Sequence, residues 1–143
     1  MGIGAVVTRL FRRGTTGFTD FESKVLSVLS DVLSPVEMER LRERVKRINL
    51  VQRLDGGREV NAFAMRGGKP VLDEDTRLDS STGEKALVQI TIEGAAGTAN
   101  TARVWLVDGN LFSIEFDEPT EHAEASAISS IRVTREPDAD RSV

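Results

Sequence analysis

The chain has 143 residues, of which 39% are hydrophobic and 29% charged, and its formal net charge is −4. This composition is typical of one globular domain and of neither a disordered chain nor a membrane protein. The chain has no cysteine and one histidine, which excludes disulfides, thiolate catalysis, cysteine-ligated zinc and any histidine-rich metal site.

The first segment, residues 1–16, is predicted to be a flexible amphipathic arm. Its apolar residues recur at helical spacing with arginines opposite them: Ile3, Val7, Leu10 and Phe11 against Arg9, Arg12 and Arg13. A helix of about a dozen residues is marginal in isolation. The basic residues follow the apolar ones, unlike those of a secretory signal, and no apolar run approaches the roughly 20 residues that span a bilayer. We therefore expect a cytoplasmic protein without a membrane span.

Two helices are predicted next. Thr19 with Glu22, and Ser34 with Glu37, match the capping-box pattern that begins a helix, and Pro35 suits a first helical turn. The apolar residues that follow form two stripes at helical spacing: Phe21, Val25, Leu29 and Val32, then Met38, Leu41, Val45 and Ile48. The charged residues of the second helix, including Arg44, are expected to face solvent.

From Ile48 onward the hydrophobic pattern alternates, which predicts β-strands. Residues 48–54 and 58–65 flank the turn signal Asp-Gly-Gly and predict a hairpin. A loop with a short extended piece at 71–72 should follow, then strands at 86–94, on both sides of 108–110, and at 128–133, with one helical turn at 121–127. The predicted fold is α+β, with two N-terminal helices packed on one face of a curved, mainly antiparallel sheet of about five strands. It forms a single domain over residues 17–134, and residues 135–143 are expected to be a disordered tail.

The register of the hairpin at 101–117 decides where the only tryptophan points. A three-residue loop over 108–110 places these pairs on the inner face: Leu106–Phe112, Val104–Ile114 and Ala102–Phe116. The pairs on the outer face are then Trp105–Ser113, Arg103–Glu115 and Thr101–Asp117. A two-residue loop at 109–110 would instead set Arg103 against Phe116, so we favour the longer loop.

Trp105 is therefore predicted on the polar face of the sheet. Either a loop or helix covers the indole there, or it belongs to a contact surface, where tryptophan is enriched. The residues predicted to bind a partner are Trp105, Arg103, Glu115 and Asp117. The predicted core of the sheet, which should meet the helix stripes, is Val88, Ile90, Ile92, Val104, Leu106, Phe112, Ile114 and Phe116.

The sequence offers little evidence for catalysis or for metal binding. Asp73 and Glu84 have the spacing of a calcium-binding loop, but Arg77 and Leu78 stand where that loop needs an oxygen ligand and a glycine. His122 lies in a predicted surface segment, and the chain has no nucleophile-elbow motif. We predict no catalytic residue, no metal site and no cofactor.

Charge is distributed unevenly along the chain. Residues 1–66 contain 12 Lys/Arg and 8 Asp/Glu, whereas residues 67–143 contain 7 and 15. An acidic half disfavours nucleic acid and suits a basic protein partner. The leading hypothesis is a non-enzymatic protein-binding module, with the physical profile of bacterial toxin-neutralising immunity proteins, that docks a basic partner through its acidic half and outer sheet face.

Two alternatives remain open. The order of elements is broadly similar to that of cystatin-like and nuclear-transport-factor-like cones, and this resemblance implies a small-ligand-binding protein or enzyme with a pocket between helix and sheet. That pocket would gather buried polar residues, with these candidates: Asn49, Gln52, Arg53, Asn61 and Glu115. The other alternative is a homodimer that pairs its outer sheet faces.

Overall fold

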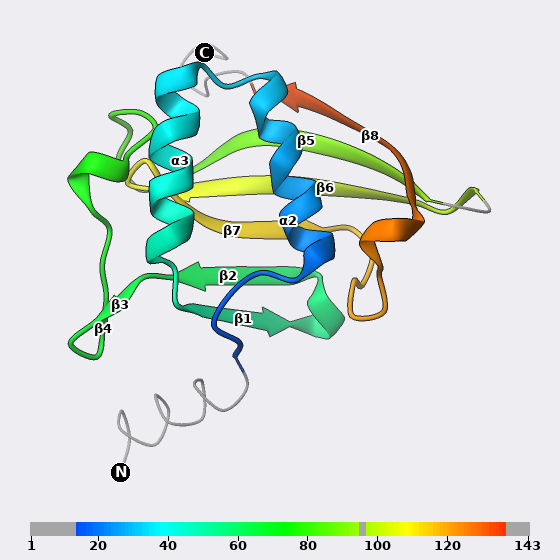
Figure 1. The fold of residues 1–143 in the computed structure, drawn as a ribbon, viewed down its shortest axis with the longest axis horizontal. Helices are drawn as coiled ribbons and strands as arrows, with labels where there is room; N and C mark the ends of the chain where they lie inside the picture. Colours follow the sequence, from blue (N-terminus) through cyan, green and yellow to red (C-terminus); the bar gives the residue numbers. More distant parts are fainter. Residues whose placement is uncertain (1–13, 95–96, 137–143) are drawn as a thin grey trace.

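The computed structural model describes residues 14–94 and 97–136. The predicted arm at 1–13 and tail at 137–143 lie outside the described residues. Two helices lie side by side on one face of a curved six-stranded sheet (Figure 1). This arrangement confirms the predicted α+β class and the placement of both helices on one face.

Each helix begins where the sequence predicts. The first, α2 (Asp20–Ser27), continues as a 3₁₀ turn at Val28–Asp31, and the second is α3 (Pro35–Arg47). At both starts the capping residue's hydroxyl, from Thr19 or Ser34, accepts a hydrogen bond from the amide three residues on. The glutamate at that position accepts one from the amide of the capping residue in return. Both capping boxes therefore stabilise helix ends as expected.

The sheet has the strand order β1-β2-β7-β6-β5-β8, and every neighbouring pair is antiparallel. The strands of the main sheet are β1 (Leu50–Leu54), β2 (Glu59–Phe63), β5 (Glu84–Gly94), β6 (Ala99–Val107), β7 (Asn110–Phe116) and β8 (Ile128–Arg135). A separate small hairpin joins β3 (Met65–Arg66) to β4 (Lys69–Pro70). The short extended piece expected at 71–72 is therefore absent from the described strands, and a 3₁₀ turn at Ala125–Ala127 replaces the expected helical turn.

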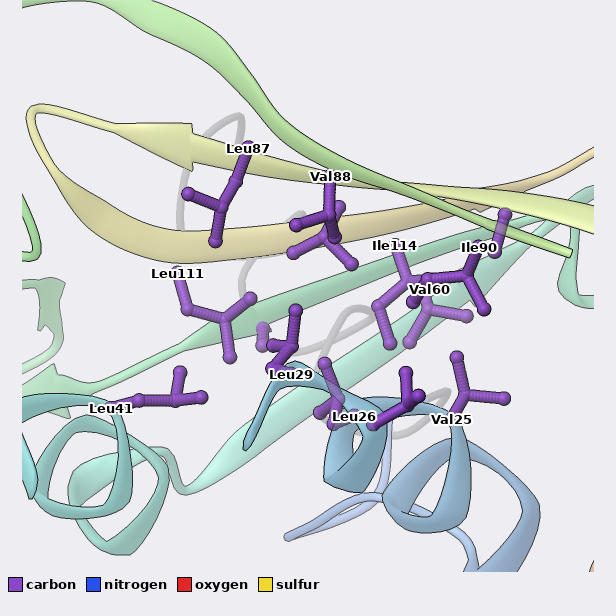
Figure 2. Packing of buried hydrophobic residues seen from close by; sticks show 14 of the residues in the cluster. Val25, Leu26, Leu29, Leu41, Val60, Leu87, Val88, Ile90, Leu111 and Ile114 are labelled. Atoms are coloured by element: carbon purple, nitrogen blue, oxygen red, sulfur yellow. The ribbon is translucent and has the colours of Figure 1, made fainter. Parts of the chain in front are cut away.

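The core fills the space between the helices and the sheet. Figure 2 shows side chains of the helices extending toward those of the sheet: Val25, Leu26, Leu29 and Leu41 toward Val60, Leu87, Val88, Ile90, Leu111 and Ile114. All predicted core positions of the sheet except Phe112 are buried. In the second predicted helix stripe, Leu41 and Ile48 are buried, whereas Met38 and Val45 are only partly buried. Arg44, expected in solvent, is 1% exposed, so that prediction is wrong.

The turn between β6 and β7 also differs from the prediction. It contains two residues, Asp108 and Gly109, which both have positive φ, 47° and 76°, as in the type I′ turns that Asp-Gly favours. Asn110 is already part of β7, where its buried side chain donates to the Asp73 carbonyl (2.9 Å). The predicted three-residue loop is therefore wrong.

A β-bulge restores the predicted register beyond this turn. Leu106 pairs with Leu111 and Trp105 with Ser113, so Phe112 is an extra residue on β7. From Trp105 to Ala102 the pairs are those predicted. Because the bulge turns Phe112 away from the helices, its predicted place in the core is wrong.

Gly109 gives a direct test of how tightly the turn is packed. A Cβ at this glycine would lie 2.5 Å from the Asp79 carbonyl oxygen, in addition to the cost of a side chain at positive φ. We expect Gly109→Ala to lower the free energy of unfolding by about 2–3 kcal/mol, measured by urea denaturation. Gly83→Ala is the matched control, because Gly83 has a φ of 73° but nothing within 4 Å of an added Cβ. Equal losses in the two variants would show that the close approach costs nothing.

Candidate functional site

Trp105 lies on the outer face of the sheet, away from the helices. Its neighbours along β6, Val104 and Leu106, are fully buried on the inner face, and Trp105 itself is half-buried. Across the strands it faces Ala86 of β5 and Ser113 of β7. The structure therefore places the indole where the strand parity predicts it.

The indole borders a shallow depression of about 260 Å³ on this face. We call its lining the Trp105 patch: Glu59, Asn61, Glu84, Trp105, Phe112, Ser113 and Glu115. The bulge supplies the second aromatic ring, because it directs Phe112 to this side. Phe112 also packs edge-on against Phe63 of β2, with ring centroids 5.4 Å apart. The outer face thus has an aromatic cluster, of which the sequence predicted Trp105 but not Phe112.

Three carboxylates surround these rings. Glu59 of β2 lies directly opposite Glu115 of β7, and Glu84 is at the start of β5. Like charges directly opposite each other on neighbouring strands are destabilising. Within residues 14–94 and 97–136, none of the three forms an ion pair with lysine or arginine; Glu59 accepts one hydrogen bond, from the Asn61 amide (2.9 Å). The patch therefore combines aromatic surface with three carboxylates that no lysine or arginine of the described residues binds.

The other predicted partner-binding residues lie beside the patch. Arg103 faces Glu115 across the strands as predicted, but its guanidinium forms an ion pair with Glu136, at 3.2 Å. Arg103, Glu115 and Asp117 also line a second depression of about 210 Å³. The four predicted residues therefore share one face, and Glu115 belongs to both depressions.

Elsewhere, carboxylates of the acidic half are neutralised by arginines and a lysine. Asp73 lies between Arg66 and Arg47, whose hydrogen bonds hold the pKa of this carboxyl below its usual value. Asp75 also binds Arg47, and Asp79 binds Lys85. The acidic half is thus not one acidic surface, whereas the carboxylates of the Trp105 patch form no ion pair with the lysines and arginines that the structure describes.

A pocket between helix and sheet exists, but not with the expected lining. Its volume is about 420 Å³, and it lies at one end of the sheet between Phe21 of α2, Ile92 of β5 and the segment 118–128. None of the five polar residues expected in such a pocket lines it. Of those five, Asn61 and Glu115 line the outer face, and Arg53 binds the buried Glu22.

We also searched the described part of the chain for a metal site, a positioned histidine and a membrane-spanning helix. Across residues 14–94 and 97–136, no group of three or more His, Cys, Asp or Glu side chains is placed to hold a metal ion. His122 borders the helix–sheet pocket, but its side chain is 93% exposed. Among the helices that the structure describes, none has the length and apolar character to cross a membrane.

Comparisons with protein-family models, with curated proteins and with solved structures gave no match.

Proposed function

We propose that this protein is a non-enzymatic binding module that docks a basic segment of a protein partner on the Trp105 patch. The observation that carries the proposal is the direct opposition of Glu59 and Glu115 beside Trp105 and Phe112. This arrangement costs folding free energy, and a cation bound between the two carboxylates would remove that cost.

The patch has the groups that bind arginine and lysine side chains. A guanidinium or ammonium group is attracted to the face of an aromatic ring, most strongly to tryptophan, and the surrounding carboxylates add charge-assisted hydrogen bonds. Tryptophan is also frequent among residues that dominate interface energies. Toxin-neutralising immunity proteins are one class of protein with this physical profile.

The same charges disfavour pairing of two outer faces in a homodimer. A two-fold interface brings the same surface patch of both copies together. Glu59, Glu84 and Glu115 of one copy would then approach those of the other, and like-charge contacts at an interface cost several kcal/mol.

The intrinsic fluorescence of Trp105 provides the test. The chain has no tyrosine and no other tryptophan, so its indole emission reports on this patch alone. We would titrate the full chain with a synthetic peptide of alternating arginine and leucine, and expect saturable quenching. Glu115→Gln should weaken this binding about three- to tenfold and raise the free energy of unfolding by about 0.2–1 kcal/mol.

The opposite signs of these two effects separate binding from structure. Replacing a residue whose role is structural would lower the free energy of unfolding. The substitution Glu115→Gln should instead raise the free energy of unfolding and weaken peptide binding. Glu39→Gln, the same charge change on the exposed side of α3, is the control and should alter neither. Equal peptide affinity for Glu115→Gln and Glu39→Gln would contradict the proposal.

A further inference from the structure

The N-terminal segment of this chain has the chemistry that the Trp105 patch fits. Residues 1–13 contain three arginines and no acidic residue, together with apolar side chains that include Ile3, Leu10 and Phe11. The segment is therefore a basic, partly apolar peptide attached to a domain that presents an acidic, aromatic surface.

The attachment point lies at an edge of the sheet. The Thr15 amide donates to the Val51 carbonyl (2.9 Å), and the Val51 amide donates to the Thr15 carbonyl (2.7 Å). These bonds hold residue 15 beside β1, which is an outermost strand. The described chain therefore begins beside this edge strand, in the plane of the sheet.

The length of the segment is sufficient to cover the patch. Residue 15 lies on the outer side of β1 and Trp105 is on β6, so the order β1-β2-β7-β6 sets them four strand spacings apart. Four spacings amount to about 19 Å, whereas 13 residues span about 20 Å as a helix and about 40 Å when extended. A short tether of this kind gives an effective concentration on the order of millimolar, so a modest intrinsic affinity is enough for occupancy.

A competing position exists on the opposite face of the molecule. An apolar groove of about 530 Å³ runs between α2 and α3, with Leu26, Met38 and Val45 in its lining. Its α3 side also has Arg42 and Lys46, whose charge has the same sign as that of the segment. Electrostatics therefore favours the outer face, where three carboxylates have no ion-pair partner within residues 14–94 and 97–136.

We infer that the segment Met1–Arg13 binds the Trp105 patch of its own chain, and that a basic partner must displace it. This inference depends on the proposed function, because both occupants use the same carboxylates and rings. The segment then acts as a tethered competitor, and it determines how tightly a partner must bind in order to displace it.

Fluorescence quenching of the full chain tests occupancy directly. The triple variant Arg9→Ala, Arg12→Ala, Arg13→Ala should release the segment and raise the acrylamide quenching constant of Trp105 by about twofold or more. It should also bind the arginine–leucine peptide about tenfold more tightly than the parent chain. The double variant Arg42→Ala, Lys46→Ala removes cations from the groove instead and should leave both measurements unchanged.

The outcomes separate this inference from the proposed function. If the acrylamide quenching constants of the parent and the triple variant are equal, the segment does not cover Trp105. The inference then fails, even where both proteins bind the peptide. If neither binds the peptide but the quenching constants differ, the proposed function fails. A difference in quenching that grows with protein concentration would mean that the segment binds a second copy, which overturns binding within one chain.

Cysteine pairs locate the segment, because the native chain has no cysteine. Under mild oxidation, Leu10→Cys with Asn61→Cys should form an intramolecular disulfide faster than Leu10→Cys with Met38→Cys. Asn61 lines the Trp105 patch and Met38 lines the groove. Faster closure of the Met38 pair would place the segment between the helices and overturn the inference.

Discussion

Replacing Arg53 with methionine should lower the free energy of unfolding by about 3–5 kcal/mol, because the change leaves a buried carboxylate without its cation. Glu22 is 2% exposed, and its two oxygens accept hydrogen bonds from the Arg53 guanidinium at 2.7 and 2.6 Å. The same guanidinium donates to the Thr15 hydroxyl and the Gly17 carbonyl. Arg53 thus joins β1 to the start of α2 and to the chain segment that precedes it.

Urea denaturation of three further variants would establish the cause. Adding Glu22→Gln to Arg53→Met should recover more than half of the loss, since glutamine preserves the capping box and removes the unpaired charge. Arg58→Met is the matched control on the same hairpin, because Arg58 is exposed and lies 3.8 Å from Asp55, which is exposed as well. Its expected cost is below about 0.5 kcal/mol. A double variant no more stable than Arg53→Met alone would mean that lost packing, not the buried charge, causes the effect.

The sequence predicts those parts of the fold that depend on local patterns. Capping boxes and apolar stripes predicted both helices, and alternation predicted the inner and outer faces of β6 correctly from Ala102 to Trp105. Alternation does not reveal a bulge, because one inserted residue changes the faces only on one side of it. The dipeptide Asp108-Gly109 was the available signal, since a two-residue turn with Ile114 and Phe116 inside requires one extra residue on β7.

Pairings between distant segments could not be predicted. Glu59 has outward parity on its strand, whereas Glu84 shares the parity of the buried Val88 and faces outward only because β5 has a bulge between Ala86 and Val88. The sequence also does not show that β2 lies next to β7, and this pairing places Glu59 opposite Glu115. The sequence predicts Arg44 in solvent, because charged side chains are seldom buried without a partner. Its partners are the backbone carbonyls of Leu111 and Val71. Because every residue has a backbone carbonyl, the sequence does not show which of them will accept a hydrogen bond from Arg44.

Arg44 connects this buried network to the proposed binding surface. Its Nε donates to the Leu111 carbonyl and its Nη1 to the Val71 carbonyl, both at 3.0 Å. Burial lowers the pKa of this guanidinium to about 10, so Arg44 remains a cation at neutral pH. Leu111 immediately precedes the bulged Phe112, and Arg44 therefore fixes the backbone that directs this ring to the outer face.

Arg44→Met should accordingly affect both stability and binding. Each carbonyl left without a donor costs about 1–3 kcal/mol, so we expect a loss of about 2–5 kcal/mol, measured by urea denaturation. In the fraction that remains folded, a bulge without its anchor should let Phe112 move relative to Trp105. Affinity for the arginine–leucine peptide should then fall about tenfold, although Arg44 itself lies on the helix side of the sheet.

The exposed Arg42 supplies the control for this prediction, because it is on the same helix without such contacts. Arg42→Met should change the free energy of unfolding by less than about 0.5 kcal/mol and leave peptide binding unchanged. Arg44→Lys retains the charge but cannot reach both carbonyls with a planar fork, so it should show an intermediate loss. A folded Arg44→Met variant with parental peptide affinity would show that the bulge keeps Phe112 in place without the arginine. Binding would then depend only on the outer face.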